Sequence, residues 1–259
     1  MQDLQKRNDA IRKWIVDASE KLKEFMTKEL IVEEKTNAHD LVTNVDKSIE
    51  EFLVGKIHEE FPNEKIISEE GFGDTVSDLD GIVWFVDPID GTTNFITEQD
   101  HFAIMIAVYE DGVGIMGYVY DVMRDVLYHG IKGHGAFEND VPMEKVKNKK
   151  LDEGLFALST NIMTKVEYEM IRQKADEALG VRMIGSAGLE ISDVANGKRV
   201  AYMASRLAPW DIAPGKVIAE EVGLVCTDFE GKAFNLLESS QAIFATPHVH
   251  RQMMDTIKK

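Results

Sequence analysis

The sequence has little cysteine and no long apolar stretch. Its single cysteine, Cys226, cannot form an internal disulfide. No apolar run approaches the roughly 18 residues of a membrane-spanning helix, and the first residues lack the pattern of a secretory signal peptide. We therefore expect a protein of the reducing cytoplasm that has no membrane partner.

Positive charge is also scarce. The chain carries 29 lysines and arginines against 46 aspartates and glutamates, a formal net charge of -17. Such an acidic field repels phosphate backbones and argues against a nucleic-acid polymer as partner. The seven histidines show no zinc-ligand spacing with the cysteine. With 44% hydrophobic residues among 259, the chain can nevertheless bury a core of ordinary globular size.

The first half of the chain combines amphipathic helices with short apolar strands. Hydrophobic residues recur at spacings of three and four over 11–26, and a second helical pattern over 46–57 stops at the proline that follows. The apolar runs 65–68 and 82–86 predict strands that are buried on both faces. From 102 to 137, strand-like stretches separated by turn residues predict an antiparallel meander.

The second half alternates strands and helices, which is typical of α/β folds. We expect strands at 156–159, 182–184, 200–203 and 242–245, with a helix after each. The first of these helices is expected to end at Leu179, and another covers 211–222. The polar segment 140–152 carries four lysines and is interpreted as a surface connection rather than as a binding patch.

A glycine pattern like that of a dinucleotide-binding turn occurs at 112–117. The residues that follow, 118–122, are β-branched and aromatic, so they favour a strand over a helix. The helix N-terminus that should face a pyrophosphate is therefore missing. We interpret the match as accidental.

Acidic residues gather at the ends of the expected strands, and the stretch 87–94, Asp-Pro-Ile-Asp-Gly-Thr-Thr-Asn, is the most specific case. Pro88 biases the chain to leave its strand in an extended conformation, so the two aspartates converge across the turn. Two carboxylates and the carbonyl of Ile89 are oxygen ligands that hard divalent cations prefer. A helix opening at Thr92 would add free amides and a favourable dipole for a phosphate. The alternative is an ordinary capped turn.

With these motifs, the sequence resembles the magnesium-dependent, lithium-sensitive phosphatases typified by inositol monophosphatase. The segments that carry the resemblance are 40–46, 68–71, 84–95, 133–137 and 210–213, in the family's order. It implies an α/β class fold, a layered α/β/α/β/α sandwich. It also implies a single domain over 1–259, with an N-terminal α+β lobe at 1–150 and a C-terminal α/β lobe at 151–259. The family commonly forms a homodimer, which we expect here.

The resemblance also assigns metal ligands. Two Mg²⁺ ions are expected as cofactors, with a third, weaker ion as an option. Glu69, Asp87 and the carbonyl of Ile89 would hold the first ion. Asp87, Asp90 and Asp211 would hold the second. Two such ions can lower the pKa of a bound water and stabilise the leaving oxygen of an in-line displacement.

Catalysis and substrate binding follow from the same resemblance. Thr92 and Asp46 would orient the attacking water, and Glu69 would assist as base, although the residues leave that division of labour open. The phosphate and substrate contacts would be Asp90, Gly91, Thr92, Thr93, Gly185, Ser186, Ala187, Arg206 and Asp211. Lys35 is an optional loop contact to the phosphate or the third ion, with a solvated surface lysine as the alternative.

Substrate choice depends on two positions. In the inositol enzymes of this family, an acid seven residues before the Trp-Asp aspartate binds inositol hydroxyls, and here Ala204 occupies that position. Arg206 faces either solvent or a second phosphate. We expect hydrolysis of inositol monophosphate or a similar small polyol phosphate, with NADP(H), adenosine bisphosphate or fructose-1,6-bisphosphate as alternatives. A catalytically silent metabolite- or cation-binding protein is the competing hypothesis from another class.

Overall fold

The computed structural model describes residues 2–27, 32–34 and 41–258. Its α-helices are α1 (Gln2–Phe25), α2 (Asn44–Glu60), α3 (Thr92–Thr97), α4 (Thr160–Thr164), α5 (Glu169–Ala175), α6 (Ala187–Ala195), α7 (Pro209–Glu221) and α8 (Pro247–Ile257). Short 3-10 turns cover Leu151–Glu153 and Val166–Tyr168. No helix in these ranges combines the length and the apolar character needed to cross a membrane.

The strands form three sheets. The largest has the order β3 (Lys65–Ser68), β4 (Ile82–Asp90), β5 (Ala103–Glu110), β6 (Val113–Asp121), β7 (Val126–Ile131), β8 (Gly135–Glu138) and β9 (Val141–Pro142). The second has the order β11 (Gly180–Arg182), β10 (Leu155–Leu158), β12 (Arg199–Leu207), β14 (Ser240–Ala245) and β13 (Val225–Thr227). A small antiparallel pair joins β1 (Val32–Glu34) to β2 (Leu41–Thr43).

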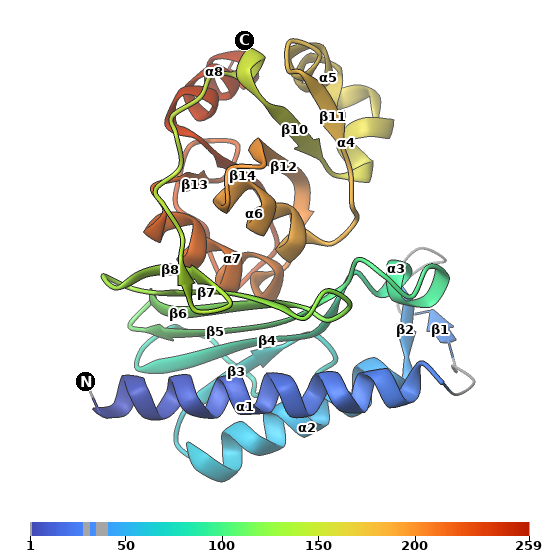
Figure 1. Cartoon of the computed structure of the whole chain (residues 1–259), viewed down its shortest axis with the longest axis vertical. Coiled ribbons are helices and arrows are strands. Elements are labelled where there is room, and N and C mark those ends of the chain that lie inside the picture. Colours follow the sequence, from blue (N-terminus) through green and yellow to red (C-terminus); the bar gives the residue numbers. More distant parts are fainter. Residues whose placement is uncertain (1, 28–31, 35–40, 259) are drawn as a thin grey trace.

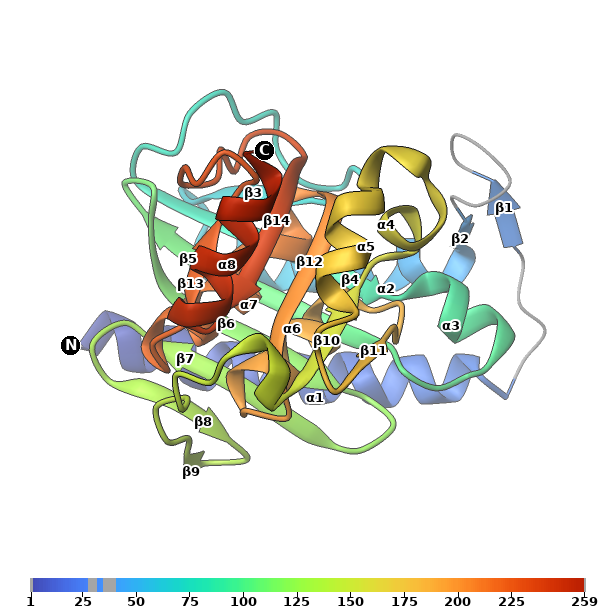
Figure 2. The same cartoon turned by 90° about the horizontal axis from the view of Figure 1, so that it is seen from above.

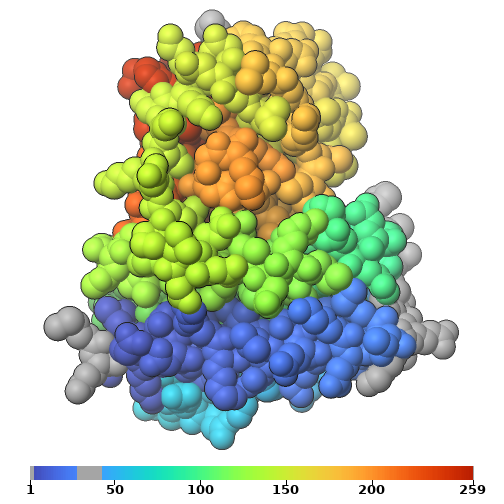
Figure 3. Space-filling view, viewed as in Figure 1, coloured from blue at the N-terminus to red at the C-terminus, as the bar shows by residue number. Residues whose placement is uncertain are grey.

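Helices and sheets alternate in layers (Figure 1). Helices α1 and α2 cover the outer face of the seven-stranded sheet, and α6 and α7 lie between the two sheets. Helices α5 and α8 lie side by side on the outer face of the five-stranded sheet (Figure 2). The space-filling view shows the same order, with the blue N-terminal part below, green above it, and orange and yellow at the top (Figure 3). The predicted α/β class and α/β/α/β/α sandwich are confirmed.

The predicted meander is confirmed, because each strand from β4 to β8 pairs antiparallel with the next. Strand β3 pairs parallel with β4. The expectation that β3 is buried on both faces is wrong: it lies at the sheet edge, where only Ile66 is fully buried. Strands β1, β2, β9 and β13 have three residues or fewer. Such short strands leave no periodic pattern, and the sequence did not predict them.

The α/β alternation of the second half is confirmed with two corrections. The helix expected to run to Leu179 is divided into α4, a 3-10 turn and α5, because the backbone at Lys165 is extended. Strand β11 lies two residues earlier than expected, so Met183 and Ile184 belong to the turn before α6. The connection 140–152 is mostly exposed, as expected, although it contains β9 and a 3-10 turn.

Two glycines let α7 approach the seven-stranded sheet closely. A Cβ atom on Gly117 of β6 would lie 2.2 Å from the carbonyl oxygen of Pro214. One on Gly130 of β7 would lie 2.9 Å from the Cα of Ile218. Any larger residue would push α7 outwards. The glycine pattern at 112–117 therefore lies at the start of β6, where Gly117 packs against α7, and no helix follows it as in a dinucleotide-binding turn.

We predict that Gly117→Ala lowers the free energy of unfolding by about 1–3 kcal/mol, because α7 must move away from β6. Gly55→Ala is the matched control. Gly55 lies on the exposed side of α2 with nothing within 4 Å of an added Cβ, so alanine should raise stability by up to about 1 kcal/mol. Urea denaturation measures both changes. Wild-type stability in Gly117→Ala would contradict the close-approach argument.

Candidate functional site

Three carboxylates from distant parts of the chain meet at the end of β4. Asp87 and Asp90 belong to β4, and Asp211 lies in the first turn of α7. Their carboxylate oxygens lie within 4.8 Å of one another. The pairing of β4 with β5 changes register between Asp87 and Asp90, where Pro88 has no N–H to donate. This irregularity lets both side chains reach the same point.

Glu69 joins these residues from the neighbouring strand. It directly follows β3, which runs parallel to β4 with Ser68 opposite Val86. Glu69 therefore lies at the same end of these two parallel strands as Asp87. Burial, followed by the charges of Glu69 and its acidic neighbours, raises the pKa of Asp87 well above its ordinary value. The structure thus brings together the four predicted carboxylates, which we call the acidic cluster: Glu69, Asp87, Asp90 and Asp211.

Burial and the charges within the acidic cluster raise the pKa values of Asp87 and Asp211. Burial, followed by the charges of Asp90 and Glu69, raises the pKa of Asp211 to about 8. Burial also raises the pKa of Asp90, although hydrogen bonds from the N-terminus of α6 oppose the shift. A divalent cation would relieve this repulsion, and the oxygen donors fit a hard ion such as Mg²⁺.

Thr92 and Asp46 are in contact at the edge of the acidic cluster. The Oγ1 atom of Thr92 lies 3.1 Å from Asp46 Oδ1 and 3.1 Å from the carbonyl oxygen of Ile89. Its single proton can go to either acceptor. Asp46 is fully buried and is fixed by a capping box with Thr43 at the start of α2. Burial raises the pKa of Asp46.

The helix expected to open at Thr92 is present as α3, and Gly91 precedes it as the N-cap. Gly91 has a φ of 96°, in the left-handed region that favours glycine. A Cβ atom there would lie 3.1 Å from the carbonyl oxygen of His101 and 3.2 Å from the Cβ of Ser186. The first amides of a helix have no acceptor within it. The amides of 91–93 therefore have no acceptor within α3.

A cavity of about 860 Å³ opens beside the acidic cluster. This size lies within the range of small-molecule sites. Its lining includes the predicted residues Asp90, Thr93, Gly185, Ala187, Arg206 and Asp211, and also Asn94, Glu190, Tyr202 and Ser205, which were not predicted. We call it the site cavity.

The turn before α6 is bound to Asp90. The Asp90 carboxylate accepts hydrogen bonds from the Ser186 hydroxyl and from the amides of Ala187 at 3.0 Å and Gly188 at 2.7 Å. Ser186 is only 1% exposed. The predicted substrate turn therefore has two parts: Ser186 holds Asp90, whereas Gly185 and Ala187 line the site cavity.

The end of β12 supplies the basic side of the site cavity. The pairing of β12 with β14 changes register between Ala204 and Leu207. An irregularity of this kind re-aims side chains, and both Ser205 and Arg206 line the cavity. Ala204 is fully buried and is not part of the lining. Lys35, the expected loop contact, lies outside the described residues.

Two unpredicted residues fix the walls of the site cavity. Asn94 Nδ2 donates to the carbonyl oxygens of His101 and Ile184, both at 2.9 Å, and so ties α3 to the turn before α6. Glu190 is 1% exposed, pairs with Arg199 and accepts a hydrogen bond from the amide of Ile184. Asn94 could have been found from its place in the Asp-Pro-Ile-Asp stretch. Glu190 resembles any other helical acid in the sequence.

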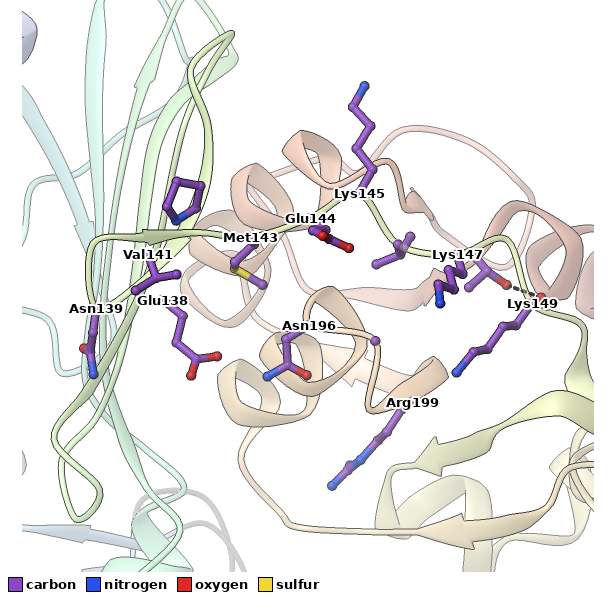
Figure 4. Close-up of a pocket in the computed structure, with 14 residues that line it drawn as sticks. Glu138, Asn139, Val141, Met143, Glu144, Lys145, Lys147, Lys149, Asn196 and Arg199 are labelled. Atoms are coloured by element: carbon purple, nitrogen blue, oxygen red, sulfur yellow. Dashed lines mark hydrogen bonds between the residues drawn. The ribbon is translucent and has the colours of Figure 1, made fainter.

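A second cavity, of about 700 Å³, lies between the segment 138–149 and the turn after α6 (Figure 4). Lys145 is exposed and points away from it in Figure 4. Arg199, its buried basic residue, is already paired with Glu190 and, at 2.9 Å, with Asp193. Lys145 and Lys147 are exposed and Arg199 is paired, so the site cavity beside the acidic cluster is the stronger candidate for chemistry.

Comparisons with known proteins show which sequences and structures this chain is similar to. The sequence model of the inositol monophosphatase family matches residues 3–259. Inositol-1-monophosphatase of Bacillus subtilis is 38% identical over 96% of this chain and 95% of its own length. A crystal structure of an IMPase/NADP phosphatase with NADP and Ca²⁺ has a TM-score of 0.91 at 29% identity, over 98% and 95% of the two chains. SaIMPase-II of Staphylococcus aureus with bound 2'AMP has a TM-score of 0.87 at 36% identity, over 96% and 93%.

We predict that the metal-free protein loses stability as the pH rises from about 4 to 8. The raised pKa values of Asp87 and Asp211 mean that the folded state binds more protons than the unfolded state in this window. Asp87→Asn removes one of the repelling charges. In EDTA at pH 8 it should therefore raise the midpoint of thermal unfolding by at least about 2 °C. A lower midpoint would show that repulsion among these carboxylates does not limit the stability of the metal-free protein.

Proposed function

Because the chain belongs to the inositol monophosphatase family, and is a phosphatase by that membership, we propose that it is a Mg²⁺-dependent hydrolase of small phosphate monoesters. The observation that carries this proposal is the convergence of the acidic cluster, the start of α3 and the site cavity. A catalytically silent binding protein would have no need for this combination.

The acidic cluster divides into two ligand sets. Glu69, Asp87 and the carbonyl of Ile89 would hold one Mg²⁺. Asp87, Asp90 and Asp211 would hold a second, and a third ion is an option. The raised pKa values in the cluster support a cation as the missing partner. When bound, such ions lower the pKa of a coordinated water and stabilise charge on the reacting phosphate.

The chain's own residues orient the water and the phosphate. With its proton donated to Asp46, the Thr92 hydroxyl would accept a hydrogen bond from the attacking water. Glu69 would assist as base. The amides of Gly91, Thr92 and Thr93 would bind phosphate oxygens, helped by the positive end of the α3 dipole.

We take inositol monophosphate, or a similar small polyol phosphate, as the leading substrate. The Bacillus subtilis relative, named inositol-1-monophosphatase, supports this choice. Gly185 and Ala187 would contact the alcohol portion. The absence of a carboxylate at Ala204 leaves the inositol hydroxyls with a different set of partners from those of the inositol enzymes.

Nucleotides with a phosphate on the ribose are the second candidate, with fructose-1,6-bisphosphate as a further alternative. Arg206 lines the site cavity and could pair with a second phosphate through its planar guanidinium group. The structures with NADP and with 2'AMP show that similar proteins hold such ligands. A cavity of about 860 Å³ has room for more than a sugar phosphate.

We predict that phosphate release depends on Mg²⁺ and stops in EDTA. The panel should include inositol-1-phosphate, glycerol-2-phosphate, fructose-1,6-bisphosphate, NADP and adenosine 3',5'-bisphosphate. Glu69→Gln should lower turnover at least about 100-fold, because a neutral amide is a poor Mg²⁺ ligand. Glu59→Gln removes an exposed carboxylate from α2 and should leave the rate unchanged. Metal-independent turnover, or an active Glu69→Gln enzyme, would refute the proposal.

We predict that Arg206→Ala separates the substrate classes. Losing a charged hydrogen bond to a second phosphate should raise KM for NADP about tenfold or more, whereas KM for inositol-1-phosphate should change less than about twofold. Arg251→Ala, at an exposed arginine of α8, is the control. Equal effects of Arg206→Ala on both substrates would rule out a second-phosphate contact.

A further inference from the structure

Two fully buried carboxylates project from one face of α2. Asp46 and Glu50 are four positions apart, so they lie one helical turn from each other on the same side. Asp46 contacts Thr92. Glu50 contacts a different part of the site, the loop between β3 and β4 that carries Glu69.

The contacts of Glu50 bracket Glu69 in the chain. Glu50 Oε1 accepts hydrogen bonds from the Ser68 hydroxyl at 2.6 Å and from the Phe72 amide at 2.9 Å. Its Oε2 atom accepts one from the Glu70 amide at 2.6 Å. Within the described ranges no cation pairs with Glu50, and these three donors from a single loop are its hydrogen-bond partners.

The loop itself is closed tightly around these contacts. The Ser68 hydroxyl oxygen also accepts the amide of Gly73 at 2.9 Å. A Cβ on Gly73 would lie 2.6 Å from the carbonyl oxygen of Ile66, so only glycine fits. The amides of Ile66 and Asp74 complete the closure by bonding to the Asp74 carboxylate and the Ile66 carbonyl, respectively.

Burying a carboxylate costs free energy that an apolar helix–loop contact would avoid. Among the described residues, the segment that Glu50 holds is the one that delivers Glu69 to Asp87. We propose that Glu50 is a positioning residue of the metal site, which fixes the backbone on both sides of Glu69 and so aims its carboxylate at the cation. This inference rests on the proposed function, because it takes Glu69 as a Mg²⁺ ligand.

The test is a direct titration of the full chain with Mg²⁺ by calorimetry, together with the Mg²⁺ dependence of phosphate release. In Glu50→Gln, one acceptor oxygen is replaced by an NH₂ group that faces amide donors. Because partners behind metal ligands typically contribute 10–100-fold to metal affinity, we expect Mg²⁺ to bind about tenfold more weakly. At saturating Mg²⁺, kcat should recover to within about threefold. Ser68→Ala removes one donor and should weaken Mg²⁺ binding in the same direction, but less.

Val54→Ala is the control for lost stability, since Val54 is buried on α2 outside these contacts. Its midpoint of thermal unfolding should be lower than that of the wild type, yet it should bind Mg²⁺ as tightly. Unchanged Mg²⁺ affinity in Glu50→Gln would reduce Glu50 to a structural role and overturn the inference. If Glu50→Gln does not fold, Ser68→Ala decides, and unchanged affinity there overturns it. If the wild-type chain binds no Mg²⁺ and releases no phosphate, the proposed function itself is refuted.

Discussion

Mutual repulsion among buried carboxylates is the constraint on which this structure depends. Asp87 and Asp90 are 1% and 7% exposed. Each has a carboxylate oxygen within 4.8 Å of one from Asp211. Charges in such a place separate, or take up protons, unless the surrounding structure is stiff. The frame around them accordingly consists of β4, helix α7 packed against the sheet, and helix α2, which carries buried acids of its own. Repulsion in this cluster lowers the free energy of unfolding, and a bound cation would offset that loss.

The stiffness comes from both sides of the seven-stranded sheet. On its outer face, α2 directs Asp46 and Glu50 towards two separate parts of the site. On its inner face, α7 is seated against glycines, which sets how far Asp211 extends towards β4. The start of α6 holds Asp90 through three donors. Asp90 is thus held by an element other than its own, whereas Asp87 and Asp211 accept hydrogen bonds from the amides of Ile89 and Ala208 in their own segments.

The parts predicted from the sequence are those whose constraints are local. Proline and glycine fix the turn from Asp87 to Gly91, and turn residues delimit the meander, so both could be predicted before the fold was known. The class of fold, the family and the phosphatase activity are likewise confirmed. The hydrogen bond from Ser186 to Asp90 and the role we assign to Glu50 depend on partners distant in the chain, and no local pattern encodes such partners. The ligand and catalytic roles, the two-lobe division, the homodimer and the cytoplasmic location stay predictions.

The seating of α7 on the N-terminal sheet has a consequence for the newly made chain. The strands of 65–142 are synthesised before the second half of the chain, whereas Asp211 is made late and completes the acidic cluster only when Pro209–Glu221 docks. Until then, the sheet surface around Gly117 and Gly130 has no helix to cover it. A chain truncated before α7 would therefore expose an apolar face and also lack one carboxylate of the acidic cluster. Docking of α7 would therefore cover this apolar surface and complete the proposed metal site in a single step.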